Sequence, residues 1–381
     1  MRKSLLYIGH AYHNKTNSTQ FLQRMFAEKY DIETISIDPL EQGMDEALRS
    51  HQGREFDCIV VFQIFPDVEA LRRTLTYRHA TYFPMYDQCK DTKIREWMTL
   101  RDFQIINFSS TLHAALLDMG LSSHYIQFFP EPRQSENDGA LDSVFFWQRL
   151  SQLNAAVVER LFENIAIKRF HIHKAVDPMH RFVEPSKKMT SISTFSTWYE
   201  SRGEMLDEIM KSAFYVAPRE YEGIGMSFLE AMAMGRCVVA VNNPTMNEYI
   251  EDGKTGLLFD LRDPQPLDGT FDFRKIQKNT IEYITQGYKR FEEEKHRILD
   301  WIELPATTDE KRMHKALLAS STTTEKHYFL RLIPILTITH SPQKTNVRLF
   351  GVIPILRMKK TAERRKIYLF SIIPIWNIQY S

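Results

Sequence analysis

Short apolar runs alternate with amphipathic segments along the first 130 residues of this chain. Residues 57–62, which read DCIVVF, are typical of a strand buried in a sheet, whereas residues 19–29 carry apolar side chains at helical spacing. The predicted strands are 4–9, 32–37, 57–62, 80–84, 104–109 and 125–129, and the predicted helices are 19–29, 45–51, 68–76 and 111–119. This βαβα order predicts an α/β fold with a parallel, doubly wound sheet.

A second set of strands and helices begins after the proline-rich, polar stretch 130–140. Strands are predicted at 143–147, 169–173, 213–217 and 237–241, and helices at 154–164, 206–211 and 274–301. A stretch without periodicity is typical of a linker, so we place a domain boundary there. The chain is expected to hold a first domain at 1–135, a second at 136–300 and a tail at 301–381.

The tail repeats one apolar pattern three times. Its Ile-Pro-Ile blocks centre on Pro334, Pro354 and Pro374, at a spacing of 20 residues. Because proline lacks an amide hydrogen and fixes its own φ, we expect neither a continuous helix nor a central strand across these blocks. Apolar blocks separated by Arg, Lys and Thr favour binding at a membrane interface. The alternative is that the blocks pack onto the body of the protein or onto a second subunit.

Charge is divided unevenly along the chain. Residues 326–381 carry ten Lys or Arg and one acid, a net charge of +9. The remaining residues carry 39 basic and 47 acidic groups, a net charge of −8, although the whole chain has +1. An acidic body with a basic tail predicts that the tail meets an anionic surface. Nucleic acid is a poorer partner, because the blocks are aliphatic rather than aromatic.

Composition is ordinary for a globular protein, with 43% hydrophobic and 25% charged residues. Cys58, Cys89 and Cys237 show no paired spacing, which disfavours a disulfide framework and favours a reducing compartment. His171 and His173 alternate on a predicted strand, and we expect a structural pair rather than a metal site. The N-terminal apolar run is too short for a signal peptide, and no run reaches the roughly 18 residues of a membrane-spanning helix.

The clearest chemical signal lies at residues 218–235. A buried strand, a Gly-x-Gly turn and a helix follow one another, and Glu222 and Glu230 flank the turn. Glycine lets the backbone approach a ligand closely, and the first amides of a helix can bind a phosphate. The alternative is an ordinary amphipathic helix with solvated glutamates. The amides expected to face a phosphate are those of Gly223, Ile224, Gly225 and Met226.

This segment resembles the Glu-x7-Glu motif of retaining glycosyltransferases of family 4. Residues 247–259, which read NEYIEDGKTGLLF, are similar to a second stretch of that family. The resemblance spans about residues 1–300. It implies the GT-B fold, in which two Rossmann-like domains face a cleft and a C-terminal helix crosses back to the first domain. It also implies sugar transfer from a nucleotide diphosphate donor with retention, without a metal ion or a cofactor.

The resemblance assigns roles to particular residues. Glu222 is expected to contact sugar hydroxyls as a catalytic residue, Glu230 the ribose hydroxyls, and Arg149 the diphosphate. A structural salt bridge is the alternative for Arg149. The lysine that the family carries about five residues later is missing, because that region reads SQLNA. Lys174 and Arg219 are candidates for the second cation, although a scaffold role suits either.

Further candidates lie beside the predicted cleft. Tyr86 and Asp87 follow a predicted strand of the first domain, and Asp87 is a second candidate catalytic residue. His10 and His13 lie on the loop after the first strand, where they can contact the acceptor or a phosphate. Either cluster can also be an ordinary polar loop. Asp177 follows the strand at 169–173, near the expected donor pocket.

Two functions remain open. The first is a retaining hexosyltransferase that builds a surface polysaccharide, such as lipopolysaccharide or capsule, on a lipid-linked or glycan acceptor. Residues 326–381 would hold it peripherally at the cytoplasmic face of the inner membrane. The second is a non-catalytic GT-B membrane scaffold that binds a nucleotide sugar or glycan. The glutamate pair and the glycines favour the enzyme, and the missing lysine favours the scaffold. The sequence leaves the sugar, base, linkage and acceptor open, and the tail can also mediate oligomerisation.

Overall fold

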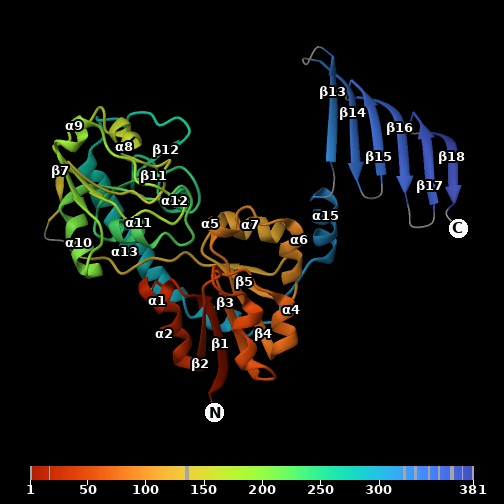
Figure 1. Ribbon diagram of the computed structural model, residues 1–381, viewed down its shortest axis with the longest axis horizontal. Coiled ribbons are helices and arrows are strands. Elements are labelled where there is room, and N and C mark those ends of the chain that lie inside the picture. Colours follow the sequence, from red (N-terminus) through yellow and green to blue (C-terminus); the bar gives the residue numbers. More distant parts are fainter. Residues whose placement is uncertain are drawn as a thin grey trace. The chain divides into compact units, whose positions relative to one another are not determined.

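A computed structural model describes residues 2–16, 18–133, 137–320, 323–329, 333–341, 344–350, 352–360, 364–370 and 372–379 (Figure 1). The boundary predicted between residues 135 and 136 lies outside these ranges and stays a prediction. The chain divides into two compact units. The first comprises residues 1–91, 102–116 and 122–307, and the second comprises 92–101, 117–121 and 308–381.

The first sheet is parallel, with the strand order β2-β1-β3-β4-β5-β6. Its strands are β1 (Lys3–His10), β2 (Tyr30–Ile37), β3 (Glu55–Phe62), β4 (Thr76–Phe83), β5 (Gln104–Asn107) and β6 (Ser123–Tyr125). The helices of this region are α1 (His13–Thr16), α2 (Gln20–Lys29), α3 (Met44–Ala47), 3-10 helix η1 (Arg49–His51), α4 (Val68–Thr74), α5 (Tyr86–Cys89) and α7 (Ser110–Asp118). The predicted alternation is confirmed. The strand predicted at 125–129 lies earlier in the chain, because residues 123–125 pair with β5.

The second sheet is also parallel, with the order β12-β11-β10-β7-β8-β9. Its strands are β7 (Ala140–Trp147), β8 (Arg169–His173), β9 (Ser193–Ser196), β10 (Ser212–Val216), β11 (Cys237–Val241) and β12 (Leu257–Phe259). The helices are α8 (Ala155–Leu161), α9 (Lys187–Thr190), α10 (Arg202–Met210), α11 (Met226–Ala233) and α12 (Met246–Tyr249). Counted within the domain, this is the strand order of a Rossmann dinucleotide-binding fold. The chain therefore contains the two Rossmann-like domains of the GT-B fold.

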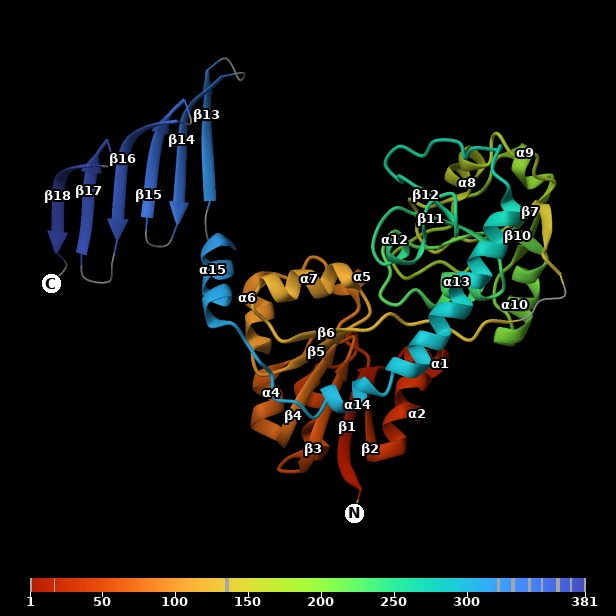
Figure 2. The same ribbon diagram turned by 180° about the vertical axis from the view of Figure 1, so that it is seen from behind.

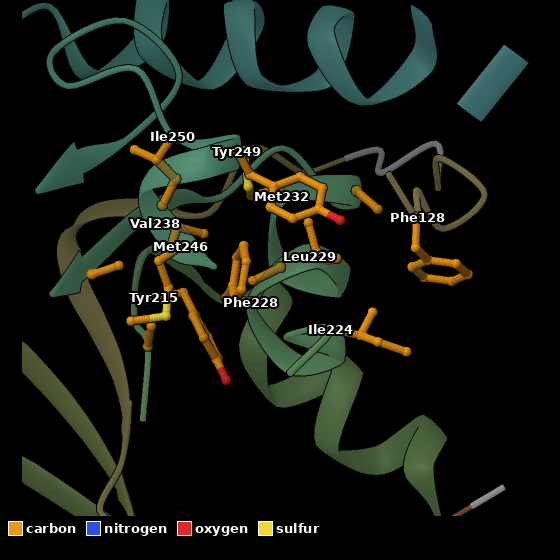
Figure 3. Packing of buried hydrophobic residues seen from close by; sticks show 14 of the residues in the cluster. Phe128, Tyr215, Ile224, Phe228, Leu229, Met232, Val238, Met246, Tyr249 and Ile250 are labelled. Carbon is orange, nitrogen blue, oxygen red and sulfur yellow. The ribbon is translucent and has the colours of Figure 1, made fainter. Parts of the chain in front are cut away.

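The small, apolar helix α11 anchors the core of the second domain. Phe228, Leu229 and Met232 are completely buried and lie beside Val238 and Tyr249 (Figure 3). The rings of Phe228 and Tyr249 are 5.7 Å apart, edge to face. This packing fixes the start of α11, and with it the glycine turn that precedes the helix.

A long helix returns the chain to the first domain (Figure 2). It is α13 (Phe273–Glu294), and a break at residues 295–296 separates it from α14 (Arg297–Trp301). Phe291 packs edge to face on Phe128, at 5.1 Å between ring centroids. Gly287 allows this crossing, because a Cβ there would lie 2.3 Å from the Phe129 ring. Among the described residues, no helix combines the length and apolarity needed to span a membrane.

The second unit contains an antiparallel sheet built from the repeats. Its strands, in spatial order, are β13 (Thr323–Phe329), β14 (Ile333–Ser341), β15 (Lys344–Leu349), β16 (Ile353–Lys360), β17 (Arg364–Leu369) and β18 (Ile373–Gln379). The unit also holds α6 (Ile94–Trp97), 3-10 helix η2 (Met98–Leu100) and α15 (Glu310–Ser320). Each repeat forms one hairpin, and the hairpins follow one another as a meander.

The expectation that the prolines exclude a central strand is wrong. Pro334 and Pro354 lie in β14 and β16, which have neighbouring strands on both sides. Each proline is the second residue of its strand and pairs beside a register shift, as Pro354 does with Arg348. A β-bulge interrupts the ladder at that point, so the missing amide hydrogen removes no regular hydrogen bond.

Candidate functional site

The candidate site lies where the strand order of the second sheet reverses. Open α/β sheets bind ligands at the carboxyl ends of their strands, at such a switch point. Here the reversal falls between β7 and β10. Arg149 follows β7, and Arg219 and Glu222 follow β10. The topology therefore brings together Arg149, Arg219 and Glu222, which the sequence analysis identified as separate candidates.

A chain of ion pairs crosses this site and reaches the first domain. Arg219 Nη1 donates to Asp87 Oδ2 at 3.2 Å, and Nη2 donates to Asp177 Oδ2 at 2.7 Å. Asp177 Oδ1 accepts from Arg149 Nε at 2.7 Å. The Arg149 guanidinium also lies over the Trp147 ring, 4.7 Å from its centroid. Two cations and two carboxylates thus alternate between the domains. The salt bridge expected as the alternative for Arg149 is present, and its contact with a diphosphate stays a prediction.

Glu222 lies beside this chain in a desolvated environment. Its side chain is nearly buried, with 9% of the residue exposed. Burial raises the pKa of Glu222 to about 7, with Arg219 opposing the shift and Asp87 adding to it. Burial also raises the pKa of Asp87, against the attraction of Arg219. The Glu222 carboxyl can therefore exchange its proton near neutral pH, as acid–base and hydrogen-bonding groups of active sites do.

The glycine turn has the local geometry that its sequence predicts. Gly225 adopts a φ of +81° as the N-cap of α11, and a Cβ there would lie 1.9 Å from the Phe228 ring. Only glycine fits such a position without strain. Ile224 is buried, and Gly225, as the N-cap residue, has no side chain that could cap the helix beginning at Met226. The first amides of α11 are therefore open to an anionic ligand.

Gly223 brings the turn against the first domain. A Cβ at Gly223 would lie 2.8 Å from the Met85 side chain and 3.1 Å from Asp87 Oδ1. Asp87 Oδ1 and Arg219 Nε are buried, and neither has a hydrogen-bond partner within the described ranges. Buried polar atoms are seldom left unpaired. Asp87 Oδ1 can therefore accept a hydrogen bond from a ligand beside the turn, and Arg219 Nε can donate one.

Glu230 has a partner that the sequence did not predict. Its carboxylate pairs with Arg202, the first residue of α10. Burial raises the pKa of Glu230, and the charge of Arg202 opposes that shift. Arg202 lies 28 residues away, on a neighbouring helix, so no local motif indicates it. The pair holds the carboxylate in place one to two turns beyond the start of α11.

The two histidines of the first loop lie at the switch point of the first sheet, between β1 and β3. His13 Nδ1 lies 2.6 Å from Ser18 Oγ, and its Nε2 contacts the side-chain oxygen of Gln63. Burial lowers the pKa of His13, so its imidazole is neutral near pH 7. His10 Nδ1 accepts the amide of Tyr12 at 3.1 Å. Gln63 has a φ of 70°, and the sequence gave no sign of its role.

Tyr86 lies next to Asp87 at the start of α5. Its ring centroid is 6.2 Å from that of Tyr221, the residue before Glu222. Burial raises the pKa of Tyr86, so its phenol is protonated and can donate a hydrogen bond. Tyr86 thus lies on the first-domain side of the glycine turn.

Lys174 is held away from the ion chain. Its ammonium lies over the rings of Phe182 and Phe195, at 4.4 and 4.2 Å. The ammonium also forms an ion pair with Glu184 Oε1, at 3.7 Å. Of the two candidates for the missing family cation, Arg219 therefore has the better position.

The His171 and His173 pair is hydrogen-bonded within the protein. His171 Nδ1 lies 2.9 Å from Thr194 Oγ1, and His173 Nδ1 lies 2.8 Å from Ser196 Oγ. Burial lowers the pKa of both imidazoles to about 4, so they are neutral near pH 7. The expected structural pair is confirmed. The described part of the chain holds no group of three or more His, Cys, Asp or Glu side chains placed to bind a metal.

Comparison with known proteins supports a glycosyltransferase. Residues 173–268 match the family model described as "Glycosyl transferases group 1". The matched segment contains Asp177, Arg219 and the whole turn from Glu222 to Glu230. No curated protein matches the chain.

Solved structures share the fold at low sequence identity. Sucrose-phosphate synthase from Thermosynechococcus elongatus is 11% identical with a TM-score of 0.56, over 78% of this chain and 100% of that one. Anabaena Alr3699/HepE, solved in complex with UDP and glucose, is 12% identical with a TM-score of 0.51, over 78% and 100%. TarM is 15% identical with a TM-score of 0.48, and this chain covers 54% of its length. The fold is GT-B, and the matched segment within it supports a glycosyltransferase.

Proposed function

We propose that this protein is a retaining glycosyltransferase that moves a sugar from a nucleoside diphosphate to a lipid-linked or glycan acceptor. One observation carries the proposal. Two arginines, a carboxyl with a pKa near 7 and the uncapped start of α11 converge at the switch point of a Rossmann-like sheet. This set of groups suits a diphosphate leaving group and needs neither a metal ion nor a cofactor.

Departure of the diphosphate is the step that needs charge stabilisation. When the bond between the anomeric carbon and the diphosphate oxygen breaks, negative charge grows on the phosphates. Arg149 and Arg219 share Asp177 as their counter-ion in the free protein. A diphosphate competes with Asp177 for both guanidiniums, and the first amides of α11 add a third source of positive potential.

The carboxyls have separate tasks in this proposal. Glu222 contacts the sugar hydroxyls, and with a pKa near 7 it can donate or accept a hydrogen bond. Asp87 offers its unpaired Oδ1 to a hydroxyl of the sugar or the acceptor. Glu230, held by Arg202, accepts the ribose hydroxyls of the nucleotide. His10, His13 and Tyr86 contribute to the acceptor side.

The acceptor class and the location follow from the tail. The net charge of +9 on residues 326–381 supports a peripheral position at the cytoplasmic face of the inner membrane, where lipid-linked acceptors are present. The product is then a surface polysaccharide, such as lipopolysaccharide or capsule. HepE was solved with UDP, which makes uridine nucleotide sugars the first donors to test.

The test measures nucleoside diphosphate release from a panel of nucleotide sugars, with a membrane extract as the source of acceptor. We expect release from one donor, loss of at least about a hundredfold in Glu222→Ala, and no change in Glu251→Ala. Glu251 is the matched control, because its side chain is 65% exposed in the same domain. The anomeric configuration of the product, read by NMR, decides between retention and inversion.

The non-catalytic scaffold is the second candidate. The missing family lysine favours it, as does the pairing of both arginines with Asp177. A protein that binds a nucleotide sugar tightly but releases no diphosphate from any donor would be a scaffold and would contradict the transferase.

A further inference from the structure

The C-terminal sheet has two chemically different faces. Paired residues of an antiparallel ladder share a face, and successive residues of a strand alternate between faces. The register therefore places Lys344, Lys359 and Lys366 in one row across β15, β16 and β17. We call this side the basic face. It also carries Thr337, Thr339, Ser341, Asn346, Arg348, Arg357 and Tyr368.

The opposite side is the apolar face. Its ladder joins Ile338 to Val347, Val347 to Leu356, and Leu356 to Leu369. The described apolar side chains of this face are Ile338, Val347, Leu349, Leu356, Met358, Ile367 and Leu369, and none of them is fully buried. Figures 1 and 2 show the sheet as a single layer. A sheet with one apolar face normally buries that face against another layer.

Exposed apolar turns continue this surface at one end of the sheet. Val352 is 78% exposed in the turn from β15 to β16, and Ile372 is 80% exposed in the turn from β17 to β18. Phe350 and Phe370 occupy equivalent places, with 55% and 52% exposed. Apolar groups repeated at one end of a sheet indicate a binding surface rather than scattered exposure.

Strands β14 to β18 carry no acidic residue that could balance their positive charge. Burial lowers the pKa of Lys344, and repulsion from Arg357, Lys359 and Arg348 lowers it further. The Nε of Arg357 is buried and has no hydrogen-bond partner among the described residues. Lys360 alternates with Lys359 and so adds an exposed cation to the rim of the apolar face. A partner that matches this surface therefore has both apolar and anionic groups.

We propose that this sheet lies on an anionic membrane surface. The apolar face and the turns at Val352 and Ile372 enter the interfacial layer, and the lysines reach acidic lipid headgroups along their flexible stems. Like an interfacial amphipathic helix, the sheet presents apolar side chains on one side and basic side chains on the other. The headgroup region is wet, so the edge strands keep water on their unpaired backbone groups.

Charge decides between the membrane and a second copy of the chain. A second copy would cover the apolar face, but its own strands β14 to β18 bring the same excess of cations and carry no acidic residue. Residues 326–381 carry +9, and the rest of the chain carries −8. An anionic bilayer attracts the sheet and repels the body, which also sets the orientation of the protein.

Flotation of the full chain with vesicles tests the proposal, and it needs no donor, so its outcome is independent of the transfer reaction. We expect binding to vesicles of phosphatidylcholine with phosphatidylglycerol and little binding to phosphatidylcholine alone. The double variant Val352→Asp/Ile372→Asp is expected to lower the partition coefficient at least about tenfold. The triple variant Lys344→Gln/Lys359→Gln/Lys366→Gln is expected to lower it on the order of a hundredfold at low salt.

The control variant is Leu40→Asp, since Leu40 is 91% exposed in the first domain, and we expect unchanged binding. Both test sites of the double variant are exposed turn positions, so the fold should survive the change. Three results would overturn the proposal: no binding to anionic vesicles, binding that the double variant leaves intact, or a stable dimer in sedimentation that the double variant dissociates. The last result would assign the apolar face to a second copy.

Discussion

The parallel sheets and the C-terminal sheet bury their residues differently. Every residue of β10 and β11 is buried, and these strands read as continuous apolar runs, SAFYV and CVVAV. In β15, KTNVRL, polar and apolar residues alternate from Asn346 to Leu349, and no residue of the strand is buried. Continuous runs are typical of parallel strands covered on both faces, and alternation is typical of antiparallel strands with two unlike faces.

The two kinds of sheet also place chemistry differently. In the parallel sheets, loops from distant parts of the sequence meet at one edge, and Asp87, Asp177 and Arg219 form a compact site there. In the C-terminal sheet, the register spreads one residue type in rows over a face. The first arrangement suits a small ligand, and the second suits an extended surface.

Among the variants proposed here, removal of the Arg219 side chain should cause the largest loss of stability and activity. Arg219→Ala leaves Asp87 and Asp177 without their shared cation, so we expect a loss of about 3 kcal/mol in unfolding free energy. Diphosphate release should fall about 10²–10³-fold. Denaturant unfolding and the release assay measure the two effects. The double variant Arg219→Ala/Asp87→Asn should recover stability but not activity, and recovery of activity would contradict the role of Arg219.

Two glycine variants can distinguish the cost of backbone strain from the cost of a steric clash. Gly225→Ala combines a positive φ with a clash against Phe228, and should cost about 3 kcal/mol. Gly235 also has a positive φ, of +71°, but the heavy atoms nearest to a Cβ there lie 3.9 Å away, so Gly235→Ala should cost about 1 kcal/mol. Thermal unfolding of both variants gives the difference. Equal losses would mean that the Phe228 ring moves aside freely.

The pH dependence of stability should report the burial of Glu222. Its folded pKa of about 7 lies above the ordinary value of 4.5, so the folded protein holds this proton longer than the unfolded chain. Stability contributed by the proton is complete below pH 4.5 and is lost as the pH rises towards 7. Glu222→Gln should therefore be more stable than the wild type above pH 7, by about 3 kcal/mol, and equal to it below pH 4.5. Unfolding curves at pH 4 and pH 8 would show no such difference if Glu222 titrates normally.

The smallest effect is expected in the C-terminal sheet. Pro354 pairs at a register shift, so Pro354→Ala should change local stability by less than about 0.5 kcal/mol. Leu356→Pro, in the regular ladder of the same strand, should cost about 3 kcal/mol. Hydrogen exchange at residues 344–360 measures both. A large effect of Pro354→Ala would mean that the proline itself shapes the bulge.

Periodicity predicted the covered parts of the fold and missed the uncovered ones. Most of the parallel strands carry continuous apolar runs, so their positions were predictable. The two that were missed are β9, STFS, which has no such run, and β12, LLF, which is only three residues long. The C-terminal sheet was missed because the bulge that tolerates Pro354 depends on its partner strand. In the site, the turn from Glu222 to Glu230 has a local signature. The contacts of Arg202 and Gln63 join segments far apart in sequence, and no short motif encodes them.

The recurring bulge makes the C-terminal sheet a linear array. Each hairpin of 20 residues repeats the same proline and the same register shift. Among the described strands, each hairpin pairs only with the hairpins beside it. In such arrays, stability is close to a sum of identical units and nearest-neighbour contacts. The length of the array can therefore change by whole hairpins without redesign of the others. The number of repeats therefore sets the area of the C-terminal sheet, and it can change without any change in the two Rossmann-like domains.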